Sequence, residues 1–407
     1  MRVMSWNGVV ESAMNGLARR IVLKAASTIR VGQLFLELPD GGTAVFGSPS
    51  AQPTAGMRIT DERFFKRAVL GGEIGFCEAY VDGLWTSDDL VGLFELAILN
   101  RRHLSRNLAL PSWLSRMRDL RLHRSRKNTL SQSKENIHAH YDLSNGFFRL
   151  FLDETMTYSC AVFSSKDQTL ADAQRNKYRL ISEKAGLSPG DSVLEIGTGW
   201  GGFAIYAAQQ YGCKVTTVTI SEEQLLLAKQ RVEEEGLSSR IDVELCDYRD
   251  VTGRYDKIVS IEMFEAVGAE YFETFFRRCD DVLRPGGRMC MQVITLPHRS
   301  FRVHRDGVNW LQKYIFPGGV LPSLAEIEKA LAPTSLSISD AEEIGHHYVE
   351  TLRRWREGFL ANLPAVRGLG FDDRFIRIWE CYLASCEAAF KARSIGDVQI
   401  VFDKPTV

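Results

Sequence analysis

The sequence lacks several features that would place its 407 residues in a common class. No stretch approaches the ~18 consecutive apolar residues that a membrane-spanning helix requires. The N-terminus carries Arg2, Arg19 and Arg20 without a continuous apolar core, so a signal peptide is not expected. The formal net charge is −1, which gives the chain no general attraction for nucleic acid. With these classes set aside, the sequence indicates a globular chain that is long enough for two or three domains.

The eight cysteines form no CxxC pair, and no cysteine–histidine grouping has the spacing of a zinc site. We therefore expect no metal site, and free thiols as in a reducing cytoplasm. One thiol, Cys160, lies within the apolar and aromatic segment MTYSCAVF. From the residues alone, such a cysteine is more often a core residue than a functional one.

The first part of the chain indicates a small α+β domain, which we assign to residues 1–105 and expect to associate with lipid or membrane. Apolar residues recur at helical spacing over residues 1–30, with basic residues between them. That helix either packs on its own domain or lies on a membrane surface. The segment GQLFLELPDGGTAVFG then has two alternating runs around Asp-Gly-Gly, which predicts a β-hairpin.

A basic segment follows, which we assign to residues 106–135. Between Arg101 and Lys134, ten lysines or arginines accompany a single acid, Asp119. Trp113 and Leu114 lie among these arginines. The segment is either a charged linker or an interfacial helix on anionic lipid.

Strand and helix patterns alternate from Asp191 onward, within a predicted catalytic domain at residues 136–407. The strand candidates are SVLEIG, KVTTVTI, IDVELC, DKIVSI and GRMCMQVIT, with helical patterns at 201–211, 222–235 and 269–283. Further helices are predicted near 324–332, 348–361 and 372–393, before a last strand, DVQIVF. This alternation predicts an α/β fold with a parallel sheet and right-handed crossovers.

The turn VLEIGTGWGGF follows the first of these strands and opens a helix, as in many nucleotide-binding sheets. The next strand ends in VTISEEQ, without the acid that NAD enzymes use for ribose, and no GxxxxGK[ST] pattern is present. Hydroxyl and amide groups of Thr219, Ser221 and Gln224 stand there instead. In CDYRD, Asp247 could bond an adenine amine while Tyr248 stacks on the ring; the alternative for Asp247 is a surface ion pair with Arg249. This pattern favours S-adenosylmethionine.

The sequence resembles the cyclopropane-fatty-acyl-phospholipid synthases and mycolic acid cyclopropane synthases from about Gly71 to the C-terminus. The motifs that carry the resemblance are GEIGFCEAYVDGLW, HAHYDLSNGFFRLFLDETMTYSCAVF, VLEIGTGWGGFA, VTISEEQ, CDYRD, MFEAVG, YIFPGG and YVETLRRW. The resemblance implies a Rossmann-like class I methyltransferase that transfers a methylene from S-adenosylmethionine to the double bond of an unsaturated acyl chain. It implies cofactor contacts at Tyr141, Tyr158, Ser159, Gly197, Gly199, Thr219, Gln224 and Tyr248; the turn chemistry adds Ser221 and Asp247.

The resemblance also implies a bound bicarbonate as the base that takes a proton from the added methyl. Its cradle would be Cys160, Glu265, Gln292, the backbone of Ile294 and Tyr348, with the Cys160 thiol as a weak donor. The chain departs from the family where a histidine is usual, with Gln292 and Ala266, and where a small residue is usual, with Glu262. A neutral amide holds an anion less tightly than a charged donor, so a steeper dependence on bicarbonate is expected.

Three other functions remain open from the sequence. The first is an acyl C-methyltransferase, which makes a methyl-branched unsaturated chain through the same first step. The second is a non-catalytic lipid-binding protein with a methyltransferase-like fold, and the third is a small-molecule or tRNA methyltransferase. The expected partners are unsaturated acyl chains at a bilayer surface, reached from the cytoplasmic side by peripheral association and without nucleic acid. The oligomeric state stays open, with a homodimer among the alternatives.

Overall fold

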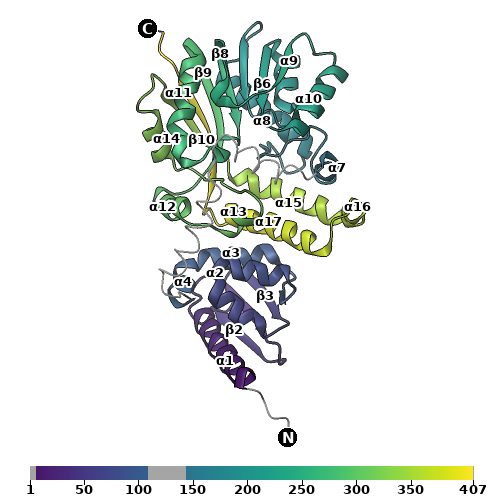
Figure 1. Ribbon diagram of the computed structural model, residues 1–407, viewed down its shortest axis with the longest axis vertical. Coiled ribbons are helices and arrows are strands. Elements are labelled where there is room, and N and C mark those ends of the chain that lie inside the picture. The colour runs from purple at the N-terminus through teal and green to yellow at the C-terminus, as the bar shows by residue number, and fades with distance from the viewer. Residues whose placement is uncertain (1–5, 109–143, 407) are drawn as a thin grey trace. The chain divides into compact units, whose positions relative to one another are not determined.

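The computed structural model describes residues 6–108 and 144–406, which belong to two compact units (Figure 1). The first unit takes the described residues of Met1–Leu122 together with Gly307–Ile315 and Gly370–Ser394. The second takes the rest of the described chain. This division differs from the three consecutive domains of the sequence analysis, because two C-terminal segments group with the N-terminal part.

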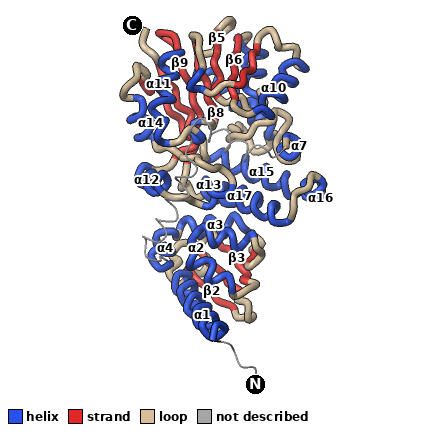
Figure 2. Tube along the Cα trace, in the orientation of Figure 1, coloured by secondary structure: helices blue, strands red, loops and turns tan. Residues whose placement is uncertain are grey.

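A four-stranded sheet with helices packed on it forms the first unit (Figure 2). Its strands are β1 (Gln33–Glu37), β2 (Thr43–Gly47), β3 (Thr54–Ile59) and β4 (Trp85–Thr86), in the order β2-β1-β3-β4. Its helices are α1 (Trp6–Ala26), α2 (Arg63–Val81), α3 (Leu90–Leu99), α4 (Arg101–Leu108), α13 (Trp310–Tyr314) and α17 (Asp373–Lys391). The predicted hairpin is confirmed as the antiparallel pair β1–β2.

Helix α17 joins this unit by packing against α2 and α3. The Tyr80 hydroxyl donates to Glu380 at 2.7 Å, and Lys391 pairs with Glu95 at 2.8 Å. Helix α2 continues to Val81 across a kink at Gly72, whose φ is 56°. Glycine tolerates that backbone conformation, so the chain changes direction there and stays helical on both sides.

The second unit is built on a seven-stranded sheet in the order β10-β11-β9-β8-β5-β6-β7. Its strands are β5 (Ser192–Ile196), β6 (Lys214–Thr219), β7 (Ile241–Leu245), β8 (Tyr255–Ile261), β9 (Leu283–Thr295), β10 (Ser337–Glu343) and β11 (Gly396–Asp403). Its helices are α7 (Asn145–Phe148), α8 (Leu170–Ala185), α9 (Gly202–Tyr211), α10 (Glu222–Glu234), α11 (Phe272–Val282), α12 (His298–Asp306), α14 (Leu324–Leu331), α15 (His346–Ala361) and α16 (Leu363–Gly368). Strands β5 to β9 pair in parallel, and β10 and β11 are antiparallel additions, which confirms the predicted α/β fold.

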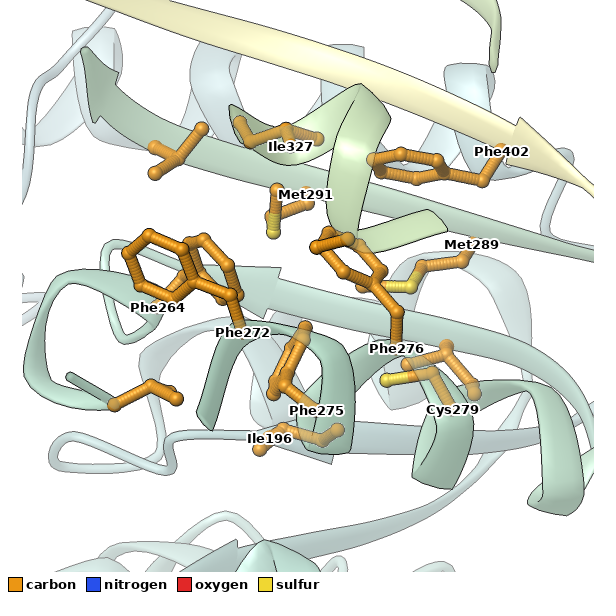
Figure 3. Packing of buried hydrophobic residues seen from close by; sticks show 14 of the residues in the cluster. Ile196, Phe264, Phe272, Phe275, Phe276, Cys279, Met289, Met291, Ile327 and Phe402 are labelled. Carbon is orange, nitrogen blue, oxygen red and sulfur yellow. The ribbon is translucent and has the colours of Figure 1, made fainter. Parts of the chain in front are cut away.

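Alternate residues of the strands face two separate cores. Met289, Met291 and Val293 of β9 pack with α11 and α14, whereas Cys290 packs on the opposite side with α8 and α9. On the α11 side, Phe264 stacks on Phe272 with ring centroids 4.4 Å apart (Figure 3). Since Phe264 is fully buried, it fixes the turn that follows β8 to the core.

Some sequence predictions fall differently or outside the described residues. The first helix is only partly covered along the apolar pattern predicted for residues 1–30: Leu17 is 61% exposed, while Ala18 and Ala25 are buried. Residues 109–143, which include Tyr141 and most of the basic segment, are not described. Across the described ranges, no helix is both long enough and apolar enough to cross a membrane.

Candidate active site

The glycine-rich turn lies at the carboxyl end of β5, where parallel sheets bind their ligands. Gly197, Gly199 and Gly201 have φ values of 103°, 51° and 83°, a region that favours glycine. A Cβ placed on Gly199 would meet no atom within 4 Å, so the space before the turn is open. A Cβ on Gly197 would lie 3.0 Å from the Cβ of Met263. The turn therefore fits a cofactor on one side and packs against the segment after β8 on the other.

The Glu195 side chain, on β5 just before the turn, helps to hold the turn in place. The Thr217 hydroxyl donates to its carboxyl at 2.6 Å, and the Thr198 hydroxyl lies 2.8 Å from that of Thr217. Burial raises the pKa of Glu195 to about 8, so the carboxyl is mostly neutral at pH 7. Within the described structure it organises the loop through the two threonines.

The predicted hydroxyl and amide group at the end of β6 is assembled as a unit. Thr219 donates to the Gln224 side chain at 2.8 Å, and the Gln224 backbone N–H donates to the Ser221 hydroxyl at 3.3 Å. Ser221 is thereby the N-cap of α10. All three side chains are buried next to the turn, so they can present polar atoms to a ribose or an amino acid only from fixed positions.

Asp247 and Tyr248 follow β7. The Arg249 guanidinium donates to both oxygens of Asp247, at 2.8 and 2.7 Å, so the alternative considered from the sequence, an ion pair, is present. It is largely buried rather than a surface pair, with the Asp247 side chain 9% exposed. The Tyr248 ring packs edge-on against Phe275 at 5.4 Å, as part of the α11-side core.

Aromatic rings and a buried lysine surround the MTYSCAVF segment. Tyr158 stacks on Trp355 with centroids 5.1 Å apart, and Tyr348 meets the same indole edge-on at 6.0 Å. Lys177 donates to the Ser159 hydroxyl at 2.7 Å. Burial lowers the pKa of Lys177 to about 8. Tyr158 and Ser159 therefore have fixed positions, whereas Tyr141 lies outside the described residues.

The five residues predicted to hold bicarbonate come together near the carboxyl ends of β8 and β9. Cys160 is fully buried, and burial raises the pKa of its thiol well above the ordinary value. A neutral thiol is a weak donor and not a nucleophile. It lies 3.3 Å from the carbonyl oxygen of Ala161. The backbone N–H of Ile294 donates to Glu265 at 2.6 Å.

Glu262 accepts hydrogen bonds from the other three residues of that set, and in the case of Cys160 the donor is the backbone N–H and not the thiol. Its Oε1 accepts from the Cys160 backbone N–H and from the Gln292 amide, each at 2.8 Å. Its Oε2 accepts from the Tyr348 hydroxyl at 2.6 Å. Glu262 has a φ of 48°, which costs a non-glycine residue about 1 kcal/mol, and such strain persists where surrounding contacts hold it. The bicarbonate cradle expected from the sequence does not fit these residues, because Glu262 and Glu265 already accept from Gln292, Tyr348 and the Ile294 backbone, and the Cys160 thiol lies against the Ala161 carbonyl oxygen.

Asp397 and Gln399, two buried residues that were not predicted from the sequence, complete the cluster. Gln292 donates to Asp397 at 3.0 Å and accepts from Gln399 at 3.1 Å, and these three side chains are fully buried. Burial, and then the charge of Glu262, raises the pKa of Asp397 well above its usual range. The same two causes raise the pKa of Glu265 to about 8. Sequence signals were present: Asp397 is an acid in the apolar strand DVQIVF, and Lys177 shares a helix face with Ala173 and Ile181.

Comparison with known proteins identifies the family. The family model described as mycolic acid cyclopropane synthetase matches residues 128–400, which is more than half of the chain. The chain belongs to the mycolic acid cyclopropane synthetase family. Its sheet is accordingly that of a class I, S-adenosylmethionine-dependent methyltransferase.

Members of the synthetase family that resemble this chain differ in the reaction their names state. The tuberculostearic acid methyltransferase UfaA1 of Mycobacterium tuberculosis is 39% identical over 95% of this chain and 90% of its own length. The cyclopropane-fatty-acyl-phospholipid synthase of Escherichia coli K12 is 37% identical over 90% of this chain and 91% of its own. Among solved structures, the mycolic acid cyclopropane synthase CmaA1 complexed with SAH and CTAB has a TM-score of 0.62 and 32% identity, covering 67% of this chain and 98% of that one.

Proposed function

We propose that this chain transfers one carbon from S-adenosylmethionine to the double bond of an unsaturated phospholipid acyl chain. A cyclopropane is the first candidate product, as in the cyclopropane-fatty-acyl-phospholipid synthase it resembles. The observation that carries the proposal is the juxtaposition of the glycine turn with the carboxylate cluster. Met263 contacts the turn at Gly197, and Glu262 and Glu265 flank Met263 and Phe264.

The cofactor, when bound, supplies a sulfonium methyl group that an electron-rich carbon can attack. An alkene is such a carbon, so no activated protein nucleophile is needed. This agrees with the neutral, buried thiol of Cys160. Donation of the alkene π pair to the methyl leaves a cation on the neighbouring acyl carbon. The protein then has to stabilise that cation and accept a proton.

The aromatic side chains beside the cluster suit the first of these tasks. Tyr158, Trp355 and Tyr348 form a continuous group of rings, and the Tyr348 hydroxyl bonds the Glu262 carboxylate. Aromatic faces attract cations, most strongly where water is excluded. The same apolar rings are compatible with a lipid chain.

A methyl-branched unsaturated chain is the second candidate product. It is favoured by the contacts of Gln292, which bonds Glu262 and Asp397, so that the position where the family usually has a histidine takes part in a carboxylate network. The name of UfaA1, a tuberculostearic acid methyltransferase, points in the same direction. Both products share the first step and differ in which carbon loses a proton.

The test uses S-adenosylmethionine with a fully deuterated methyl group and unsaturated phospholipid vesicles. Mass spectrometry of the acyl chains counts the retained deuterium. A cyclopropane keeps two deuterium atoms because one is lost from the methyl, whereas loss of a chain hydrogen keeps all three. Proton NMR of the product confirms a ring or an alkene. Absence of any label in the acyl chains would rule out the proposed function.

A further inference from the structure

We infer that the Glu262 carboxylate is the base that takes the proton after one-carbon transfer, in place of a bound bicarbonate. This inference rests on the proposed function, since it concerns the step that follows methyl transfer. It assigns a catalytic role to a residue that the sequence analysis noted only as a departure from the family.

The first argument is the identity of the donors. Three of the five residues predicted to surround bicarbonate donate a hydrogen bond to Glu262 instead: Cys160 through its backbone N–H, Gln292 through its amide and Tyr348 through its hydroxyl. A glutamate carboxylate and a bicarbonate share the same planar O–C–O group, so one set of donors suits either. Here that set is filled by a group covalently attached to the chain.

The second argument is position. Glu262 directly follows β8, and its backbone N–H donates to the Gln292 carbonyl oxygen at 2.8 Å, which holds the residue at the end of the sheet. The next residue, Met263, lies against the cofactor turn at Gly197. Glu262 is therefore the neighbour in sequence of the residue that contacts the cofactor turn, close to where the methyl donor is expected.

The third argument is the charge of the cluster. Burial raises the pKa of Glu265 to about 8, so this carboxyl is largely protonated at neutral pH, and burial together with the charge of Glu262 raises the pKa of Asp397 in the same direction. A protonated carboxyl cannot accept the product proton. Glu262 accepts three hydrogen bonds, which hold its carboxyl group in one orientation. It is the member of the cluster suited to act as the base.

The step balances without another reactant. The alkene π pair forms the new bond to the methyl carbon, and the electron pair of the broken carbon–sulfur bond stays on sulfur. A Glu262 oxygen then accepts a proton from the cationic chain. The released C–H pair closes the ring or forms a double bond, according to the carbon that loses the proton. Glu262 returns the proton to solvent before the next turnover.

This inference reverses the bicarbonate dependence expected from the sequence. Wild-type protein should form product at the same rate in bicarbonate-depleted and bicarbonate-supplemented buffer. The assay follows transfer of the deuterated methyl to vesicle lipid, so it separates two failures. No transfer in either buffer would sink the proposed function, whereas transfer that requires bicarbonate would overturn only the role of Glu262.

Two variants test the residue directly. Glu262→Gln keeps the size of the side chain and removes the base, so product formation should fall by roughly 100-fold or more. Glu262→Gly fits the positive φ and vacates the position among the three donors, so added bicarbonate should restore product by about tenfold or more. Glu270→Gln, an exposed carboxylate in the same loop region, is the matched control and should behave as wild type.

Thermal unfolding establishes that each variant is folded before rates are compared. A folded Glu262→Gln variant with normal product formation would contradict the inference, and so would a folded Glu262→Gly variant that bicarbonate does not restore. A further readout is the fate of the cation in Glu262→Gln. Without its base the cation should be trapped by water, giving a methylated hydroxy chain that wild type does not make.

Discussion

The Tyr348 hydroxyl lies 2.6 Å from Oε2 of Glu262 and joins helix α15 to the turn after β8. Tyr348 is buried, and its ring meets Trp355 edge-on. The phenol is therefore held by packing and can orient the carboxylate. The hydrogen bond from Tyr348 is one of the contacts that hold Glu262 in its strained backbone conformation.

Tyr348→Phe should reduce turnover while leaving cofactor affinity nearly unchanged. The substitution conserves the ring and removes one hydrogen bond to a charged group, worth about 1.5–3 kcal/mol. At ~1.4 kcal/mol per tenfold, kcat should fall by about 10- to 100-fold. The measurements are steady-state kcat and calorimetric affinity for S-adenosylmethionine. Tyr206→Phe on α9, away from the cluster, is the control; equal kcat in both variants would show that the bond is dispensable.

Gly199→Val should abolish S-adenosylmethionine binding. Gly199 has a φ of 51°, which disfavours a branched residue, and the open space before it is where the cofactor is expected. Gly190→Val is the control for the effect of backbone strain. Gly190 also has a positive φ, and a Cβ placed on it would likewise meet no atom within 4 Å. Calorimetry should detect binding by the control only. Equal affinities in the two variants would remove the turn from the cofactor site.

The basic segment should recruit the chain to anionic membranes, a prediction that rests on sequence because residues 109–143 are not described. Replacing Arg116, Arg118, Arg121 and Arg124 with glutamine should weaken sedimentation with anionic vesicles by roughly 1 kcal/mol per arginine. High salt should have the same effect on wild type.

The control for recruitment replaces four arginines of the second unit with glutamine, Arg179, Arg277, Arg284 and Arg353. Their ion pairs are largely exposed and add little to stability. This variant has the same net charge as the first. If the fraction of protein that sediments with anionic vesicles falls equally in both variants, recruitment depends on total charge and not on the segment.

The sheet of the second unit could be predicted because its strands are apolar runs bounded by turns, as in β5 and β9. Strand β10 was missed because every residue of SISDAEE is exposed, so hydrophobic patterning gives no signal. The grouping of α17 with the first unit was also missed. It depends on tertiary contacts, such as Tyr80 with Glu380, that join residues 300 positions apart.

The members of the candidate site were largely accessible from motifs, but their bonding was not. Cys160, Gln292 and Tyr348 were selected for a bicarbonate cradle, and they do come together. The sequence could not show that Glu262 would turn its carboxylate toward them, because its positive φ at the end of β8 and its three donors from distant segments leave no pattern in the sequence. Asp397 entered the site through pairing of β11 with β9, which places Asp397 opposite Ile294.

Glu265→Gln should stabilise the protein, and more so at pH 8 than at pH 5. Burial raises the pKa of Glu265 to about 8, and among the described residues its Oε2 has no hydrogen-bond partner. A carboxyl with a raised pKa in the folded state contributes fully below its ordinary pKa of about 4.5. That contribution is lost as the pH rises toward 8, because only the unfolded chain ionises freely. Glutamine can still accept from the Ile294 N–H and has no such penalty.

The measurement is the thermal unfolding midpoint of wild type and variant at both pH values. Each ~1 kcal/mol relieved should raise the Tm of the second unit by about 2–4 °C, so the gain should be a few degrees at pH 8 and smaller at pH 5. Glu233→Gln, an exposed carboxylate on α10, should change Tm at neither pH. A gain from Glu265→Gln that is equal at the two pH values would mean that Glu265 does not titrate in this window. The protonated state assigned to it beside Glu262 would then be wrong.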